Sequence, residues 1–352
     1  MEHKMEELLA AAEQGDMNAQ LNLGACYATG RGVEPDMEQA VLWFRRAAES
    51  GSVEARFNLG LCYMRGDGVE ADPVQAAEHF KSAAEGGYME AQNNLAVCYS
   101  EGRGMEQSEE NAVRWFKAAA EQGSPVAQRQ LAIRYSQGIG TEQDHKEAFR
   151  WFEQAAEQGD PEGQRRLAFS HAMGLGTEKD EKKAFYWFRK SAQSGDMEGQ
   201  RSLAVCYGQG IGTHKDDKAS FRWFLKAAQQ GDMESQRNVG FCYTMGAGTT
   251  RDQKSAFLWF QKAARQGDPI AEYQVGACYL NGLGVPQDYQ KALNFIRSAA
   301  EKGLSAAQHM LALYYEAGMG VPKDLDKAIY WLSKAAEQGD QQAAQHMEKL
   351  KK

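Results

Sequence analysis

The sequence has few of the features that mark a membrane, disulfide-bonded or nucleic-acid-binding protein. Its 352 residues include only six cysteines and seven prolines. It has no apolar run of roughly 18 residues, which excludes a membrane-spanning helix. The formal net charge is −8, and basic residues form no dense stripe. Since a protein binds a nucleic-acid backbone by displacing counterions with Lys and Arg, nucleic acid is not expected as the main partner.

Motifs for catalysis and metal binding are also missing. The sequence contains no G-x-S-x-G, no H-E-x-x-H and no P-loop. The cysteines lack C-x-x-C spacing, and the seven histidines do not cluster at ligand spacing. No insertion is present that could form an active-site lid. We therefore predict a protein that is not an enzyme and that needs neither a metal nor another cofactor.

What the sequence does have is a strict internal repeat. A glycine recurs every 36 residues, at Gly15, Gly51, Gly87, Gly123, Gly159, Gly195, Gly231, Gly267, Gly303 and Gly339. A fixed period of this length is typical of a solenoid, in which each unit packs only on its neighbours. We predict one all-α solenoid domain over residues 1–352. Residues 16–339 form nine repeats, residues 1–15 an N-terminal capping helix and residues 340–352 a C-terminal capping helix.

Each repeat reads as two amphipathic helices joined by a glycine turn. In the first repeat, Asp16 and Asp36 are at positions suited to cap the two helices, and Gly30 is suited to end the first one. The apolar residues of each helix fall on one helical face. All seven tryptophans occupy one slot of the second helix, each followed by a phenylalanine or leucine. We expect this aromatic stripe to form the core between hairpins.

The cysteines occupy a single slot, with at most one in each repeat: Cys26, Cys62, Cys98, Cys206, Cys242 and Cys278. Equivalent slots of packed helices lie roughly 8–10 Å apart, whereas a disulfide needs Cα atoms about 4.4–6.8 Å apart. We predict reduced, buried thiols.

These residues resemble the Sel1-like repeat family, a relative of the tetratricopeptide repeat. The pattern is A-x-x-x-L-G-x-C-Y-x-x-G-x-G-V-x-x-D-x-x-x-A-x-x-W-F-x-x-A-A-x-x-G, and it covers essentially the whole chain. The resemblance implies a right-handed α/α superhelix whose first helices line a concave face. It also implies a role as an adaptor or scaffold, mostly in bacteria. A cysteine-rich branch, associated with penicillin binding, carries two cysteines per repeat. This chain lacks that framework.

Function is expected where the repeats differ from one another. With the residue that caps the first helix (Asp16 in the first repeat) counted as slot one, slot six holds arginine in four consecutive repeats: Arg129, Arg165, Arg201 and Arg237. Guanidinium groups suit carboxylates and phosphates. We predict that this column binds a protein or peptide, with an acidic segment among the candidates. The flanking candidates, from slots six and ten, are Phe57, Phe169, Phe241, Tyr273 and His309.

A structural interpretation of the arginines stays open. Glu162, Glu198 and Glu234 each precede one of them by three residues, and such pairs stabilise a helix surface by about 0.2–0.5 kcal/mol each. Arg129 has Val126 at that position, so by this count it is the least neutralised of the four.

Arg134 and His171 are secondary candidates, because they replace the cysteine and the tyrosine of the repeat. They could form a local polar pocket. In the alternative, Arg134 extends outward to solvent and His171 is a hydrogen-bonded core histidine.

We therefore predict a protein–protein interaction adaptor that binds a peptide or partner protein on the concave face. The alternatives are an envelope-associated or secreted protein in a structural or host-contact role, and a penicillin-binding or hydrolytic protein of the cysteine-rich branch. The N-terminal residues lack the apolar stretch of a signal peptide, so the chain as given is expected to be cytoplasmic, or periplasmic or secreted if a leader has been removed. The partner and the oligomeric state stay open.

Overall fold

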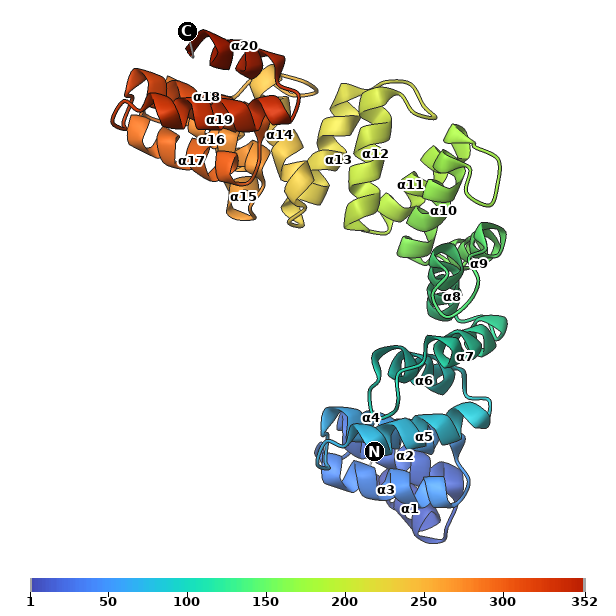
Figure 1. Cartoon of the computed structure of the whole chain (residues 1–352). Helices are drawn as coiled ribbons and strands as arrows, with labels where there is room; N and C mark the ends of the chain where they lie inside the picture. The colour runs from blue at the N-terminus through green and yellow to red at the C-terminus, as the bar shows by residue number, and fades with distance from the viewer. Residues whose placement is uncertain (1, 351–352) are drawn as a thin grey trace. The chain divides into compact units, whose positions relative to one another are not determined.

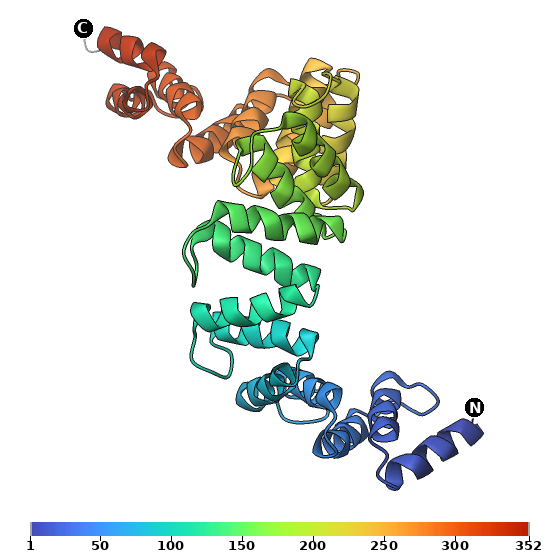
Figure 2. The same ribbon diagram turned by 90° about the vertical axis from the view of Figure 1, so that its right-hand side faces the viewer.

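The structure is a computed structural model that describes residues 2–350, and the regular structure within them is entirely α-helical. Within each of the two compact units named next, consecutive helices pack against one another as hairpins (Figures 1 and 2). The chain divides into two compact units, Met1–Lys179 and Asp180–Lys352. Each unit is described by itself below.

The first unit contains the capping helix and four full hairpins, followed by the first helix of the fifth repeat. Its helices are α1 (Glu2–Glu13), α2 (Met17–Thr29), α3 (Met37–Glu49), α4 (Val53–Arg65), α5 (Pro73–Glu85), α6 (Met89–Glu101), α7 (Glu109–Glu121), α8 (Pro125–Gln137), α9 (His145–Glu157) and α10 (Pro161–Met173).

The second unit begins with the second helix of that repeat and ends with a lone first helix. Its helices are α11 (Glu181–Gln193), α12 (Met197–Gln209), α13 (Asp217–Gln229), α14 (Met233–Met245), α15 (Gln253–Arg265), α16 (Pro269–Asn281), α17 (Tyr289–Glu301), α18 (Ser305–Ala317), α19 (Leu325–Glu337) and α20 (Gln341–Leu350). The even-numbered helices α2–α18 are the first helices of the nine repeats, and the odd-numbered helices α3–α19 are the second helices.

The helix ends lie where the capping residues predict them. The Asp16 carboxylate accepts a hydrogen bond of 2.7 Å from the backbone N–H of Ala19 at the start of α2. Gly30 ends α2 in the left-handed region, with φ 71°. Two first helices depart from the pattern, because Tyr88 and Leu304 at their N-caps make no side-chain capping bond.

The core of each repeat lies between its two helices and the adjacent hairpin. Slot nine of the first helix is glycine or alanine in every repeat, and we call it the small slot. The leucine or valine that precedes it is at most 1% exposed in all nine repeats. At Gly24, an added Cβ would lie 2.6 Å from Cδ1 of Phe44. The small slot therefore exists to admit the ring of the second helix.

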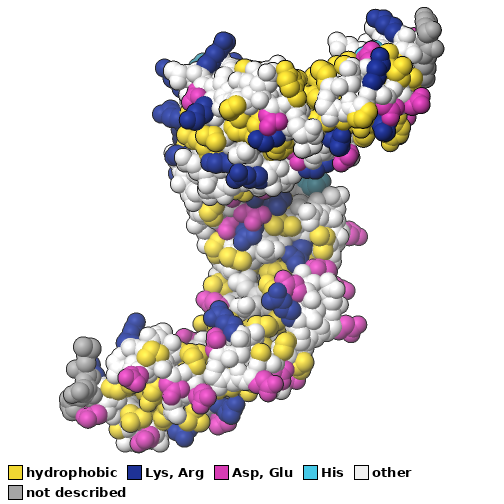
Figure 3. All heavy atoms as spheres, turned by 90° about the vertical axis from the view of Figure 1, so that its left-hand side faces the viewer, with side chains coloured by type: hydrophobic (Ala, Val, Ile, Leu, Met, Phe, Trp, Pro, Cys, Tyr) yellow, Lys and Arg dark blue, Asp and Glu magenta, His cyan; other side chains and the backbone are white. Residues whose placement is uncertain are grey.

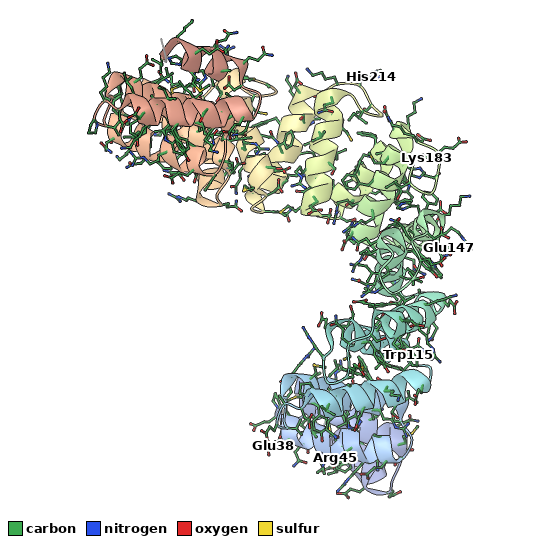
Figure 4. The ribbon with its side chains drawn as sticks, viewed as in Figure 1. Glu38, Arg45, Trp115, Glu147, Lys183 and His214 are labelled. Atoms are coloured by element: carbon green, nitrogen blue, oxygen red, sulfur yellow. The ribbon has the colours of Figure 1, made fainter. Side chains whose placement is uncertain are left out.

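The tryptophans are less buried than the sequence suggests. Trp43 is 5% exposed, but the other six are only partly buried; Figure 4 labels Trp115 on α7. The phenylalanine or aliphatic residue that follows each one is at most 9% exposed. Several tryptophans carry a cation on their outer face, such as Lys262, whose Nζ lies 3.7 Å from the Trp259 ring centroid. Most tryptophans nevertheless pack against the core clusters, as the aromatic stripe predicts. A basic residue three positions later lies over the ring at Trp43, Trp223 and Trp259.

The second glycine of the turn packs on the preceding repeat. Gly104 has φ 71°, and a Cβ added there would overlap the backbone carbonyl of Pro73. Gly68 and Met37 make the same approach one repeat earlier. Glycine is required here by both the positive φ and the close backbone contact.

Candidate functional site

Three of the four slot-six arginines lie over the N-cap of the next repeat's first helix. Arg237 on α14 places Nη1 2.6 Å from Oδ2 of Asp268, which caps α16. Arg201 on α12 places Nη1 2.8 Å from Oδ2 of Asp232, which caps α14. These pairs join consecutive repeats, and the two carboxylates are only 1% and 5% exposed.

Arg129 on α8 belongs to the same set. Its Nε lies 3.0 Å from Oδ1 of the capping Asp160, and its Nη1 lies 2.8 Å from Oε2 of Glu162. The prediction that Arg129 is the least neutralised arginine is therefore wrong. The sequence comparison considered charges on the same helix only, whereas the partners of Arg129 belong to the following repeat.

Arg165 is the most buried of the four, with 8% of the residue exposed. Its Nη2 lies 3.7 Å from Oε1 of Glu162, three residues earlier. This is the expected i,i+3 pair, at a distance too long for a hydrogen bond.

Where slot six is neither arginine nor histidine, the next capping residue is not aspartate. The rings of Phe57 and Tyr88 have centroids 5.2 Å apart. Asn93 donates from Nδ2 to Oγ of Ser124 at 2.8 Å. Tyr273 and Leu304 both pack against the same core cluster, and His309 Nδ1 lies 3.5 Å from Oδ2 of Asp340. Slot six and the next N-cap thus form a matched pair that joins repeats.

Arg134 is buried and does not extend outward. It is 8% exposed, it donates from Nη2 to Oγ of Ser100 at 2.8 Å, and its Nε lies 3.3 Å from Oε2 of Glu109. Its guanidinium also lies 4.4 Å from the Phe116 ring centroid. Burial lowers the pKa of Arg134, and Glu109 opposes that shift. The alternative that Arg134 extends to solvent is therefore wrong, because the Glu109 carboxylate at the start of α7 attracts its guanidinium inward.

His171 is 4% exposed, and it makes an edge-to-face contact with Phe149 at 5.2 Å. It belongs to the core between α9 and α10. The polar residues of this region therefore do not form one shared pocket around Arg134 and His171.

Among the predicted aromatic residues, Phe169 has the largest exposed fraction, at 43%. Phe57 and Phe241 are partly buried, with ring centroids 5.8 and 5.1 Å from Phe80 and Phe260. Tyr273 is partly buried, and that burial raises the pKa of its phenol.

Phe169 borders a pocket of about 200 Å³ between α8, α9 and α10. Phe152 and Leu175 supply apolar walls, and Ser170 stands at the slot where most repeats have cysteine. Arg166 lines the same pocket and is paired with Glu162 at 3.1 Å. Met173, one turn after Phe169, is 70% exposed. This patch of exposed apolar side chains on a first helix was only partly predicted, through Phe169.

A second network, which the repeat pattern alone did not indicate, links slot five of several first helices to the second helices before and after it. Gln128 in slot five donates from Nε2 to the carbonyl oxygen of Ala120 at 3.2 Å, and its Oε1 accepts from Gln158 at 2.8 Å. The same arrangement recurs at Gln92 and Gln236 with their own slot-35 partners. We call this set of slot-five and slot-35 side chains the glutamine ladder.

On the face that Figure 3 shows, apolar side chains are interspersed with charges of both signs. Within residues 2–350, no group of three or more His, Cys, Asp or Glu side chains is arranged to hold a metal ion. The same residues include no helix with the length and apolar character that crossing a membrane requires. All six cysteines are free thiols, as predicted, but only four are buried, because Cys26 and Cys242 are partly exposed.

Together, the matched hairpins, the inter-repeat pairs and the absence of strands from the described residues define an α-helical solenoid repeat protein. The family model described as Sel1 repeat matches nine times, at residues 18–52, 53–88, 90–124, 125–160, 161–196, 198–232, 234–268, 269–304 and 305–340. The chain belongs to the Sel1 repeat family.

Two solved structures resemble nearly the whole chain. One is a protective antigen present in uropathogenic Escherichia coli strains, with 32% identity, a TM-score of 0.64, and coverage of 98% of this chain and 93% of that one. The other is a Sel1 repeat protein from Oxalobacter formigenes, with 30% identity, a TM-score of 0.60, and coverage of 98% and 90%. A comparison with curated proteins gave no significant match. Sel1 repeat proteins generally mediate protein–protein interactions, and the family is one of non-enzymatic scaffolds.

Proposed function

We propose that this protein is an adaptor that binds an extended segment of a partner protein along the surface of its first helices. The observation that carries the proposal is the patch on α10, where Phe169 and Met173 are 43% and 70% exposed beside the pocket of about 200 Å³. An exposed apolar patch with a pocket and a polar rim is typical of a protein-binding site.

The slot-ten side chains extend this patch along the first unit. Val97 on α6 is 36% exposed, and Ile133 on α8 is partly exposed. Packed helices lie roughly 8–10 Å apart, and an extended chain rises about 3.3 Å per residue. A bound segment would therefore present an apolar side chain at about every third position.

The slot-six arginines have a different part in this proposal. Arg129, Arg201 and Arg237 are ion-paired to the next repeat, so they position the first helices that carry the binding surface. Direct contact between these arginines and an acidic partner stays a prediction. Its test is the salt sensitivity of partner capture.

The test is affinity capture of partner proteins from the source cell's lysate with a variant in which Phe169 and Met173 are both alanine. We expect the bound partner to fall at least about tenfold, which corresponds to the loss of two exposed anchors at about 1 kcal/mol or more each. Val74→Ala is the matched control, because Val74 is 53% exposed on the second helix α5 of the same unit. Equal capture by wild type and the double variant would refute the site.

A second candidate is a surface or envelope role in contact with a host. It is favoured by the relative that is 32% identical and is described as a protective antigen. Fractionation of the source cells, with an antibody against this protein, tests it. Recovery in the cytosolic fraction alone would exclude this candidate and support the cytoplasmic location predicted from the sequence.

A further inference from the structure

Repeat two has an unusual cluster of basic groups between its own second helix and that of repeat one. A pocket of about 430 Å³ lies between α3, α4 and α5. Arg45 on α3, Arg56 and Tyr63 on α4, and His79 and Ser82 on α5 line it. Figure 4 labels Arg45 on α3. We call this the Arg56 pocket.

The pocket exists because repeat two departs from the others at several slots together. His79 replaces the tryptophan of seven repeats, and Ser82 occupies the slot where Arg46, Lys226 and Lys262 cover their tryptophans. Gly86 replaces the slot-35 side chain of the glutamine ladder. Each change shortens a side chain that would otherwise fill or cover this space.

Arg56 replaces the slot-five glutamine, and its guanidinium forms no ion pair with the described residues. Its Nη1 donates to the Ser82 hydroxyl at 3.2 Å. Among residues 2–350, no carboxylate oxygen lies within 4.0 Å of the guanidinium nitrogens of Arg56 or Arg45. Arg45 is exposed and donates from Nη2 to the Tyr63 hydroxyl at 3.1 Å. Glu49 lines the pocket but is exposed to solvent.

Repeat eight shows how the same slot carries a charge when the role is structural. There Glu272 replaces the glutamine and is 7% exposed. Lys302 at slot 35 places Nζ 2.7 Å from its Oε1, and Ser298 donates to Oε2 at 3.0 Å. The opposite charge that repeat eight supplies at slot 35 is missing from repeat two, where the slot is Gly86.

We propose that the Arg56 pocket binds an oxyanion, a phosphate or carboxylate group carried by a small molecule. Two guanidinium forks, an imidazole and two hydroxyl groups converge there, and all of them can donate hydrogen bonds to such a group. The volume lies within the range of small-molecule sites. The Arg56 pocket shares no lining residue with the pocket beside Phe169 on α10, so it does not depend on the proposed partner-binding patch.

The electrostatic surroundings of His79 agree with an anion site at this pocket. Burial lowers the pKa of His79, Arg45 and Arg56 lower it further, and Glu78 opposes them. The imidazole stacks on Tyr63, with centroids 5.5 Å apart. An oxyanion bound beside the two arginines would offset their repulsion and raise this pKa again.

The experiment is isothermal titration of the full chain with inorganic phosphate and, separately, with citrate, each at constant ionic strength set with sodium chloride. One variant combines Arg45→Ala with Arg56→Gln, the latter restoring the glutamine of seven other repeats. A second combines His79→Trp with Ser82→Lys, which refills the pocket with the pair found at Trp223 and Lys226. The matched control is Arg189→Ala, because Arg189 is exposed in the slot of Arg45 in another repeat.

We expect wild type and the control to bind at least one of the two anions, and both pocket variants to bind it at least about tenfold more weakly, since hydrogen bonds to charged groups are the strong ones. The anion that binds more tightly names the group, and either one supports the proposal. The proposal is overturned if wild type binds neither anion, if the pocket variants bind like wild type, or if Arg189→Ala weakens binding equally.

Discussion

The pair formed by Arg237 and Asp268 offers a direct test of whether the arginine column holds the repeats together. Asp268 is 1% exposed and lies 2.6 Å from the guanidinium. The same carboxylate caps α16 by accepting from the backbone N–H groups of Ile270 and Ala271 at 2.8 and 3.1 Å. One carboxylate therefore serves both the helix end and the contact between repeats.

The magnitude follows from these contacts. Arg237→Ala leaves a buried carboxylate that two backbone amides still satisfy, so the free energy of unfolding should fall by about 2 kcal/mol, the range of a hydrogen bond to a charged group. Asp268→Ala also loses the cap, which is worth about 1 kcal/mol more. The double variant should cost about as much as Asp268→Ala alone, giving a coupling energy of about 2 kcal/mol.

A matched control comes from the chain itself. Repeat eight has tyrosine at slot six and leucine at the following N-cap, so Arg237→Tyr combined with Asp268→Leu should cost only about the 1 kcal/mol of the lost cap. Arrays of repeats can unfold in parts, so hydrogen exchange of α14–α16 should accompany urea denaturation. A coupling energy below about 0.5 kcal/mol, as in exposed ion pairs, would refute the inter-repeat role.

Three further predictions concern other slots. Lys302→Ala should lower the free energy of unfolding by about 1–3 kcal/mol, because it leaves the buried Glu272 carboxylate without its cationic partner. The variant that combines Glu272→Gln with Lys302→Gln should have a urea midpoint close to that of wild type. A much lower midpoint for this double variant would contradict the account. Iodoacetamide at pH 8 should label the partly exposed Cys26 before the four buried cysteines, Cys62, Cys98, Cys206 and Cys278. Burial raises the thiol pKa of those four to about 11, which leaves little reactive thiolate at pH 8. Labelling of a buried thiol before Cys26, measured by peptide mass spectrometry, would count against the fold. Folding lowers the pKa of His79 below 6.5. As pH falls below about 6.5, the unfolded chain therefore binds the proton first, and the free energy of unfolding should decline until the pH passes the folded-state pKa. His79→Phe should lose less stability over that range, and identical melting temperatures of the two proteins at every pH would contradict the shift.

Much of the fold could be predicted because the same pattern of capping, turn and core residues recurs in nine repeats. The capping aspartates, the glycine that ends each first helix and the small slot opposite the ring all lie where their residue types require. The place of the tryptophans against the core could be predicted as well. The exposed fraction of each ring could not, because periodicity shows which residues share a face and does not show how completely neighbouring side chains cover each one.

The partners of the arginines were missed for a related reason. The search for counter-charges stayed within one helix, at a spacing of three residues, while Arg129 pairs with Asp160 across 31 positions of sequence. The signal was present, because the residue at slot six changes together with the next N-cap, from arginine and aspartate to phenylalanine and tyrosine. Contacts between repeats can therefore be predicted when slots are compared across repeats as well as along one helix.

The Phe169 patch could be predicted only in part. Slot ten is apolar in all nine repeats, which does not separate a core position from an exposed one. The pocket beside Phe169 depends on the packing of three helices and on the small Ser170, and no single-residue pattern indicates it.

The close approach of the turn glycines to the preceding repeat also restricts how this protein can change in length. A residue inserted into the turn at Gly104 would move a backbone that already touches the carbonyl of Pro73, and the equivalent turns at Gly68, Gly140 and Gly176 meet the preceding repeat in the same way. Addition or loss of a complete 36-residue module preserves every one of these contacts, whereas a single-residue change breaks one. Duplication and deletion of whole modules is thus the route by which such a chain can be extended or shortened, in evolution and in the laboratory.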